Sequence, residues 1–122
     1  MATPAAHASR AISIEKNAGR VVVYMDGQVV AETGSALTVH EGWLPPVVYV
    51  PREDVDMSWL TRGECGPSLT DLGSRICYSV GRDGQAANAA WTYDETSEAA
   101  AAIREHIAFD LKYIDAIEEH PG

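Results

Sequence analysis

The chain has 122 residues, which is enough for one domain and too few for an enzyme with separate cofactor and substrate domains. Acidic residues outnumber basic ones 18 to 9, so the formal net charge is −9 and phosphate backbones and anionic lipid headgroups are repelled. Hydrophobic residues make up 46%, and no apolar run approaches the roughly 20 residues of a membrane span. We therefore expect one soluble domain with no nucleic-acid and no membrane partner.

The N-terminus lacks the charged start and apolar core of a signal peptide. We expect residues 1–10 to form a flexible tail, residues 11–117 a single domain and residues 118–122 a C-terminal tail. A cytoplasmic location follows as the expectation, and cysteines stay reduced there. A disulfide between Cys65 and Cys77 is left open, because spacing alone does not decide pairing.

Strands are predicted through the first two-thirds of the chain. Residues 20–25 and 28–33 are rich in β-branched side chains, and Asp26-Gly27 lies between them. Asp-Gly between two apolar runs is a strong hairpin signal, because a type I′ turn needs positive φ at both central residues. Further strands are expected at residues 12–15, 36–40, 47–50, 76–80 and 88–93.

The C-terminal part carries two competing patterns. Ser97 precedes an alanine-rich stretch, and Ile103, Ile107, Leu111 and Ile114 recur at helical spacing. Alternation of Ile107, Phe109 and Leu111 instead fits one face of a strand, although pattern alone favours the helix. The fold class expected is mainly β, with antiparallel strands joined by tight turns and one short C-terminal helix.

Several segments together resemble a known family. They are residues 20–23 (RVVV), 30–33 (VAET), 36–41 (ALTVHE), 45–55 (PPVVYVPREDV), 88–93 (NAAWTY) and 103–110 (IREHIAFD). The chain resembles the bacterial and fungal family catalogued as domain of unknown function 427, sometimes labelled nucleotidyltransferase-like. Within these segments, residues 51–55 (PREDV) are the most specific.

The resemblance implies a β-tent-like fold, in which two antiparallel sheets lean together at an apex. It also implies a closing strand around Ile107 to Asp110, after a short helix from about Ser97 to Arg104. For residues 105–114 the pattern favours a helix and the resemblance implies a strand. The choice is left open, since tertiary pairing can override local propensity.

One segment departs from the family pattern. Many members carry a Cys-Pro-x-Lys element before the second block, whereas this chain has Leu69 and Leu72 at the cysteine and lysine positions. Gly73 and Tyr78 still match. Whether Cys65 takes the place of the missing cysteine is left open, and chemistry resting on that element is not implied for this chain.

Five residues form the predicted ligand site: Tyr49, Arg52, Asp54, Trp91 and Tyr93. Trp91 and Tyr93 alternate in a strand and so share a face, which would form the floor of an aromatic groove for a small ligand or a protein partner. Arg52 can bind a carboxylate or phosphate with two hydrogen bonds. The alternative interpretation is that the aromatic residues pack the core and the charged ones form an ordinary turn.

The second hypothesis is a nucleotidyltransferase-like or other enzyme acting on an anionic small substrate. Arg52 would bind the anion, and Asp54 would act as a base or hold Mg²⁺ together with Asp56. A homodimer whose interface is its function is a third hypothesis. We predict no cofactor and no resident metal, because phosphate-binding glycine loops and paired metal-ligand spacings are absent from the sequence.

Overall fold

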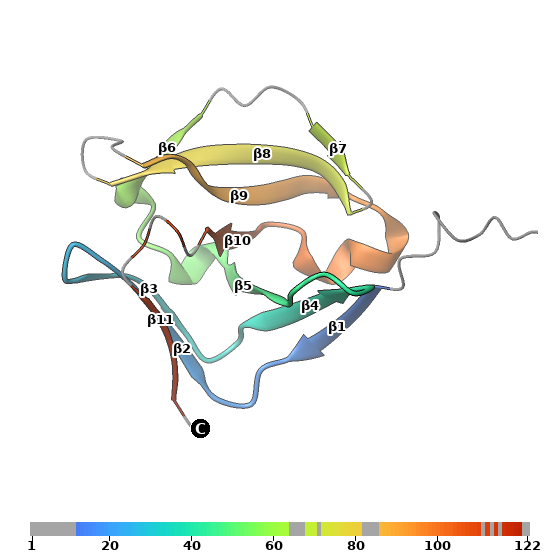
Figure 1. The fold of residues 1–122 in the computed structure, drawn as a ribbon, viewed down its shortest axis with the longest axis horizontal. Helices are drawn as coiled ribbons and strands as arrows, with labels where there is room; N and C mark the ends of the chain where they lie inside the picture. Colours follow the sequence, from blue (N-terminus) through green and yellow to red (C-terminus); the bar gives the residue numbers. More distant parts are fainter. Residues whose placement is uncertain are drawn as a thin grey trace, which may run out of the picture.

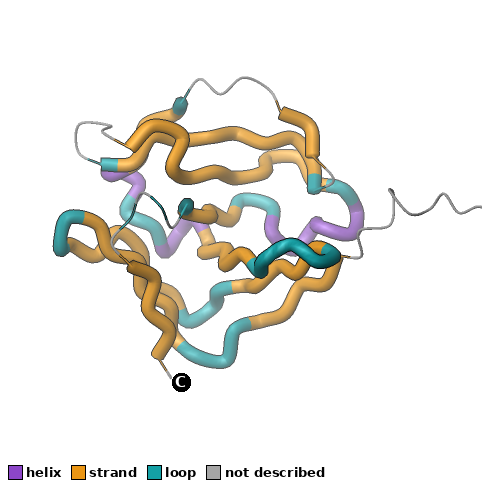
Figure 2. The backbone as a smooth tube through the Cα atoms, viewed as in Figure 1, coloured by secondary structure: helices purple, strands orange, loops and turns teal. Residues whose placement is uncertain are grey.

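The computed structural model describes residues 12–63, 68–70, 72–81, 86–110, 112, 114 and 116–120. These residues form β-strands and short 3-10 helices, and the strands build two antiparallel sheets (Figures 1 and 2). The prediction of a mainly β domain with two antiparallel sheets is confirmed, whereas its β-tent-like type stays a prediction. In this part of the chain no helix has the length and apolarity to cross a membrane.

The larger sheet contains eight strands. In spatial order they are β1 (Ile12–Lys16), β4 (Leu37–Glu41), β5 (Val47–Pro51), β10 (His106–Phe109), β9 (Ala86–Thr96), β8 (Gly73–Val80) and β6 (Leu60–Arg62), with β7 (Ser68–Thr70) also paired to β8. The sheet therefore joins segments that are far apart in sequence, and β10 lies at its centre (Figure 1).

The smaller sheet has the order β11 (Ala116–His120), β2 (Arg20–Met25) and β3 (Gln28–Thr33). The predicted hairpin is confirmed, because Asp26 and Gly27 both have positive φ, 54° and 74°, and connect antiparallel strands. The segment expected as a C-terminal tail overlaps β11, whose Ile117 is partly buried against the core. The segment was expected to be a tail because Glu118 and Glu119 are charged. Both side chains are exposed in β11, which is an edge strand.

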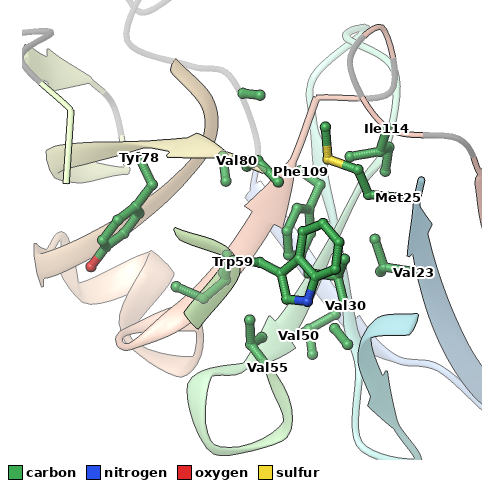
Figure 3. Close-up of a cluster of buried hydrophobic side chains, with 14 of the residues drawn as sticks. Val23, Met25, Val30, Val50, Val55, Trp59, Tyr78, Val80, Phe109 and Ile114 are labelled. Atoms are coloured by element: carbon green, nitrogen blue, oxygen red, sulfur yellow. The ribbon is translucent and has the colours of Figure 1, made fainter. Parts of the chain in front are cut away.

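The main core lies between the two sheets (Figure 3). Val23 and Met25 of the smaller sheet pack in one cluster with Val50 and Phe109 of the larger sheet. Trp59, which is 3% exposed, lies among them and supplies the largest apolar surface of the cluster. A second cluster contains Tyr49, Tyr93 and Ala108, together with Ala100 and Ile103 of the 3-10 helix η3 (Glu98–Ile103).

The predicted C-terminal helix is wrong in type, because η3 is a 3-10 helix of six residues. Its two buried residues, Ala100 and Ile103, are three positions apart. Three residues complete one turn of a 3-10 helix, so this geometry places both side chains against the sheet. The strand expected after it is confirmed as β10, which pairs with β5 and β9 and thereby overrides the helical spacing.

Cys77 corrects a second expectation. It is disulfide-bonded and 2% exposed, so the expectation of reduced cysteines is wrong for this residue. Cys65 and the question of whether it replaces the family cysteine lie outside the described residues, as does the predicted N-terminal tail.

Gly73 offers a test of the strand pairing between β8 and β9. Its φ is +140°, and a Cβ atom there would lie 2.1 Å from the carbonyl oxygen of Glu95. We expect Gly73→Ala to lower the free energy of unfolding by about 2–4 kcal/mol in chemical denaturation. Gly34→Ala is the control, because a Cβ at Gly34 meets nothing within 4 Å and should change stability by less than about 1 kcal/mol. Equal stability of the two variants would contradict the tight approach.

Candidate functional site

Three of the five predicted site residues lie together on one face of the larger sheet. Tyr49 of β5 and Trp91 of β9 each lie opposite Ala108 of β10. Because Ala108 has only a methyl group, the indole reaches across it, and Trp91 Nε1 donates a hydrogen bond to Tyr49 Oη at 3.1 Å. The ring centroid of Tyr93 lies 6.5 Å from that of Tyr49, in a tilted arrangement. These residues form one aromatic cluster.

Most of this aromatic cluster is interior. Tyr49 is 2% exposed and Tyr93 3% exposed, and burial raises the pKa of the Tyr49 hydroxyl well above its ordinary value. Trp91 is only partly buried, and the guanidinium of Arg75 lies 4.6 Å from the centre of its ring as a cation–π contact. Tyr49 and Tyr93 therefore belong to the second core cluster, and Trp91 is the member that also borders a solvent hollow.

The other two predicted residues lie on η1 (Arg52–Asp54), a 3-10 turn directly after β5. Arg52 Nη1 donates a hydrogen bond to Tyr78 Oη at 3.3 Å. Asp54 Oδ2 accepts a hydrogen bond from Thr33 Oγ1 at 2.6 Å, which ties the turn to the end of β3. Arg52 and Trp91 line different hollows, so the structure does not gather the five residues into one groove.

Arg52 lines a hollow of about 560 Å³ that we call the Arg52 hollow. Its walls are Pro51, Arg52, Glu53, Val55, Met57, Arg104, Glu105 and His106. The hollow forms where the end of β5 meets the start of β10, because His106 lies opposite Pro51 in the sheet. Arg52, Arg104 and Glu105 are exposed, whereas Val55 is buried and provides an apolar floor.

The turn at Glu105 shapes this hollow. Glu105 has φ +62°, a left-handed conformation that residues other than glycine adopt at a cost of about 1–2 kcal/mol. Two backbone hydrogen bonds hold it there: its N–H donates to the carbonyl of Tyr93 at 3.2 Å, and its carbonyl accepts from the N–H of Arg52 at 3.1 Å. The neighbouring core strands thus impose the turn and place Arg104 and His106 beside Arg52.

The groups in the Arg52 hollow suit recognition of an anion. Arg52 and Arg104 carry five N–H donors each in their guanidinium groups. His106 Nδ1 lies 3.1 Å from the carbonyl oxygen of Arg104, and because a carbonyl oxygen only accepts, this contact is a hydrogen bond when Nδ1 carries the proton. Glu53 and Glu105 add carboxylates, which accept hydrogen bonds from ligand hydroxyl or amino groups.

The carboxylate pair considered for Mg²⁺ is arranged differently from the expectation. The strand pattern predicted Asp54 and Asp56 on one face, but Asp54 ends η1 whereas Asp56 caps the next turn, η2 (Met57–Trp59). Asp56 Oδ1 accepts from the N–H and the Oγ of Ser58, at 3.1 Å and 2.6 Å, and Asp54 is bonded to Thr33. Within the described ranges no group of three or more His, Cys, Asp or Glu side chains is placed to hold a metal ion.

Sequence reasoning missed Arg104 and Glu105 as site residues. They follow an alanine-rich stretch and look like the exposed end of a helix. The sequence did predict a strand starting near Ile107. That strand points to Arg104 and Glu105 only when it is known to pair with β5, because His106 then lies opposite Pro51, next to Arg52.

The fold and the hollow define a small, mainly β domain of two antiparallel sheets with a polar pocket at a strand end. The family model NTP_transf_9, described as domain of unknown function (DUF427), matches residues 13–120, so the chain belongs to this family. The resemblance inferred from the sequence motifs is thereby confirmed. A search of curated proteins gave no match.

The buried hydroxyl of Tyr49 predicts an alkaline loss of stability. Below pH ~10 the hydroxyl is protonated in both states, but at higher pH it ionises in the unfolded chain before it ionises in the folded one. The free energy of unfolding should therefore fall as pH rises above about 10. In Tyr49→Phe this part of the fall should vanish, while the lost hydrogen bond costs about 1 kcal/mol at neutral pH.

Urea denaturation from about pH 8 to about pH 11 measures this dependence. Trp91→Phe is the control, because it removes the same hydrogen bond and keeps the titrating hydroxyl. An alkaline slope in Tyr49→Phe as steep as that of the parent protein would contradict the assignment to Tyr49.

Proposed function

We propose that this domain binds a small molecule with a carboxylate or phosphate group in the Arg52 hollow. The observation that carries the proposal is the left-handed turn at Glu105, which holds Arg104 and His106 beside Arg52. Unfavourable backbone conformations persist where surrounding structure imposes them, and they concentrate at functional sites.

The donors of this hollow are partly organised before a ligand arrives. The hydrogen bond to Tyr78 Oη fixes the Arg52 guanidinium, and Tyr78 itself is 8% exposed and anchored in the main core. Asp54 holds the turn that carries Arg52 through its bond to Thr33, so its expected role is positioning. Preorganisation lowers the entropic cost of binding, which supports a ligand site more than an accidental cluster of surface charges.

The mixed charge of the hollow narrows the ligand class. Arg52 and Arg104 oppose Glu53 and Glu105, and the chain as a whole carries a charge of −9. A polyanion would be repelled by the net negative charge. A small molecule with one anionic group and several hydrogen-bond donors can pair with both the arginines and the glutamates. Hydroxylated or amino-substituted carboxylates and monophosphates fit this description. In this proposal Arg52 binds the anion, as expected from the sequence. Tyr49, Trp91 and Tyr93 do not line this hollow and instead pack together on the larger sheet.

Binding can be tested with glycerol 3-phosphate and glutamate as probes, and with uncharged glycerol as the reference. In a ¹H–¹⁵N NMR titration, the two anions should shift the backbone signals of Arg52 and His106, and glycerol should not. Arg52→Gln or Arg104→Gln should each weaken binding about tenfold or more, because each removes a charge-assisted hydrogen-bonding group.

Arg20→Gln is the matched control for these variants. Arg20 lies on β2, where it forms a surface ion pair with Glu32, and its removal changes the net charge equally. If Arg20→Gln weakens binding as much as Arg52→Gln, the effect is a general charge effect and the proposed site is wrong. Absence of shifts with either anion at millimolar concentration would also contradict the proposal.

A further inference from the structure

We propose a second binding site in this protein, for a small hydrophobic cation such as an alkyl- or arylammonium compound. It lies in a hollow of about 530 Å³, which we call the Trp91 hollow. The proposal is independent of the Arg52 hollow, because the two hollows have different walls and would select ligands of opposite charge.

The Trp91 hollow exists because β10 is shorter than its neighbours. In the register of β5 and β10, Tyr49 lies opposite Ala108, so Val47 would lie opposite Asp110. Asp110 instead donates its backbone N–H to the carbonyl of Ala89 at 2.7 Å, on the β9 side. Pro45 and Pro46 precede Val47 and have no N–H to donate, so they cannot extend the pairing.

Apolar side chains from three parts of the fold line this opening. Val48 comes from β5, Phe109 from β10 and Ile117 from the smaller sheet, and the diproline segment borders them. Trp91 of β9 also borders the hollow, and its hydrogen bond to Tyr49 holds its side chain on the sheet face opposite to Val48 and Phe109. The volume is within the range of about 300–1,000 Å³ that small-molecule pockets occupy.

The charged residues among these described walls are both acidic. Asp110 Oδ1 accepts from the N–H of Lys112 at 3.0 Å, and Glu119 Oε1 accepts from Asn17 Nδ2 at 3.2 Å. Each bond engages one oxygen of its carboxylate. The guanidinium of Arg75 already lies over one face of the Trp91 ring. A ligand ammonium is therefore expected at the carboxylates, with its apolar body at Phe109 and Ile117.

A cation with an apolar body therefore matches both features of the hollow. The carboxylates of Asp110 and Glu119 supply charge-assisted hydrogen bonds to an ammonium group. The net charge of −9 favours approach of cations and disfavours anions of the same shape.

The test is an NMR titration of the labelled protein with benzylammonium chloride, beside benzoate and benzyl alcohol as shape-matched probes. Binding of the amine should move the backbone N–H signal of Asp110 and the methyl signals of Ile117. Benzoate should cause no such shifts, and benzyl alcohol should bind more weakly by about fivefold or more. Equal affinity for the amine and the acid would overturn the proposal.

Glu119→Gln and Asp110→Asn should each weaken amine binding about fivefold, and both side chains keep an acceptor oxygen so that the local hydrogen bonds survive. Glu118→Gln is the matched control, since Glu118 is adjacent in sequence, points from the other face of β11 and has a hydrogen bond to the Tyr24 side chain. The control should bind like the parent protein. An effect of Glu118→Gln as large as that of Glu119→Gln, or a double variant with parental affinity, would overturn the site.

Discussion

The pairing of β10 on both of its edges is the constraint on which the rest of the structure depends. His106 to Ala108 pair with β5 on one side and Ile107 to Phe109 with β9 on the other. The strand thereby joins β1, β4 and β5 to β9, β8 and β6. Ile107 and Ala108 are fully buried, so the strand is fixed by packing on both faces as well as by hydrogen bonds at both edges. The hydroxyl of Thr92 donates to the carbonyl of His106 at 2.6 Å and secures the register at its start.

The two candidate sites are consequences of where this strand begins and ends. The Arg52 hollow opens at the start of β10, directly after the left-handed turn at Glu105 that leads the chain into this strand. The Trp91 hollow opens at the other end of β10, near Phe109, where its pairing with β5 stops. A strand shorter than its two neighbours, β5 and β9, therefore leaves an opening at each of its ends, and the side chains at the two openings carry charges that suit ligands of opposite sign.

Features that depend on neighbouring residues could be predicted from the sequence. The hairpin at Asp26-Gly27 follows from the need for positive φ at both turn positions. The PREDV segment drew attention to Arg52, which lines a hollow in the structure. These conclusions need no knowledge of which strands pair.

Features that depend on long-range pairing could not be predicted in the same way. The intrinsic propensity of the alanines at 99–102 favours an α-helix, whereas the structure has the 3-10 helix η3, with Ala100 and Ile103 buried. Glu105 adopts its conformation because Tyr93 and Arg52 hold it, and these residues are twelve and fifty-three positions away in the sequence. Arg104 consequently joins the hollow through tertiary structure alone.

The late position of β10 and β11 in the chain has a consequence for synthesis. When the ribosome has produced the segments up to η3, the larger sheet still lacks its central strand and the smaller sheet consists of the β2–β3 hairpin only. The edges of β5 and β9 then have no partner along their inner sides, and such edges are templates for pairing with other chains. Closing loops this long also slows folding relative to proteins with local contacts. The nascent domain is therefore most vulnerable to aggregation before β10 and β11 emerge.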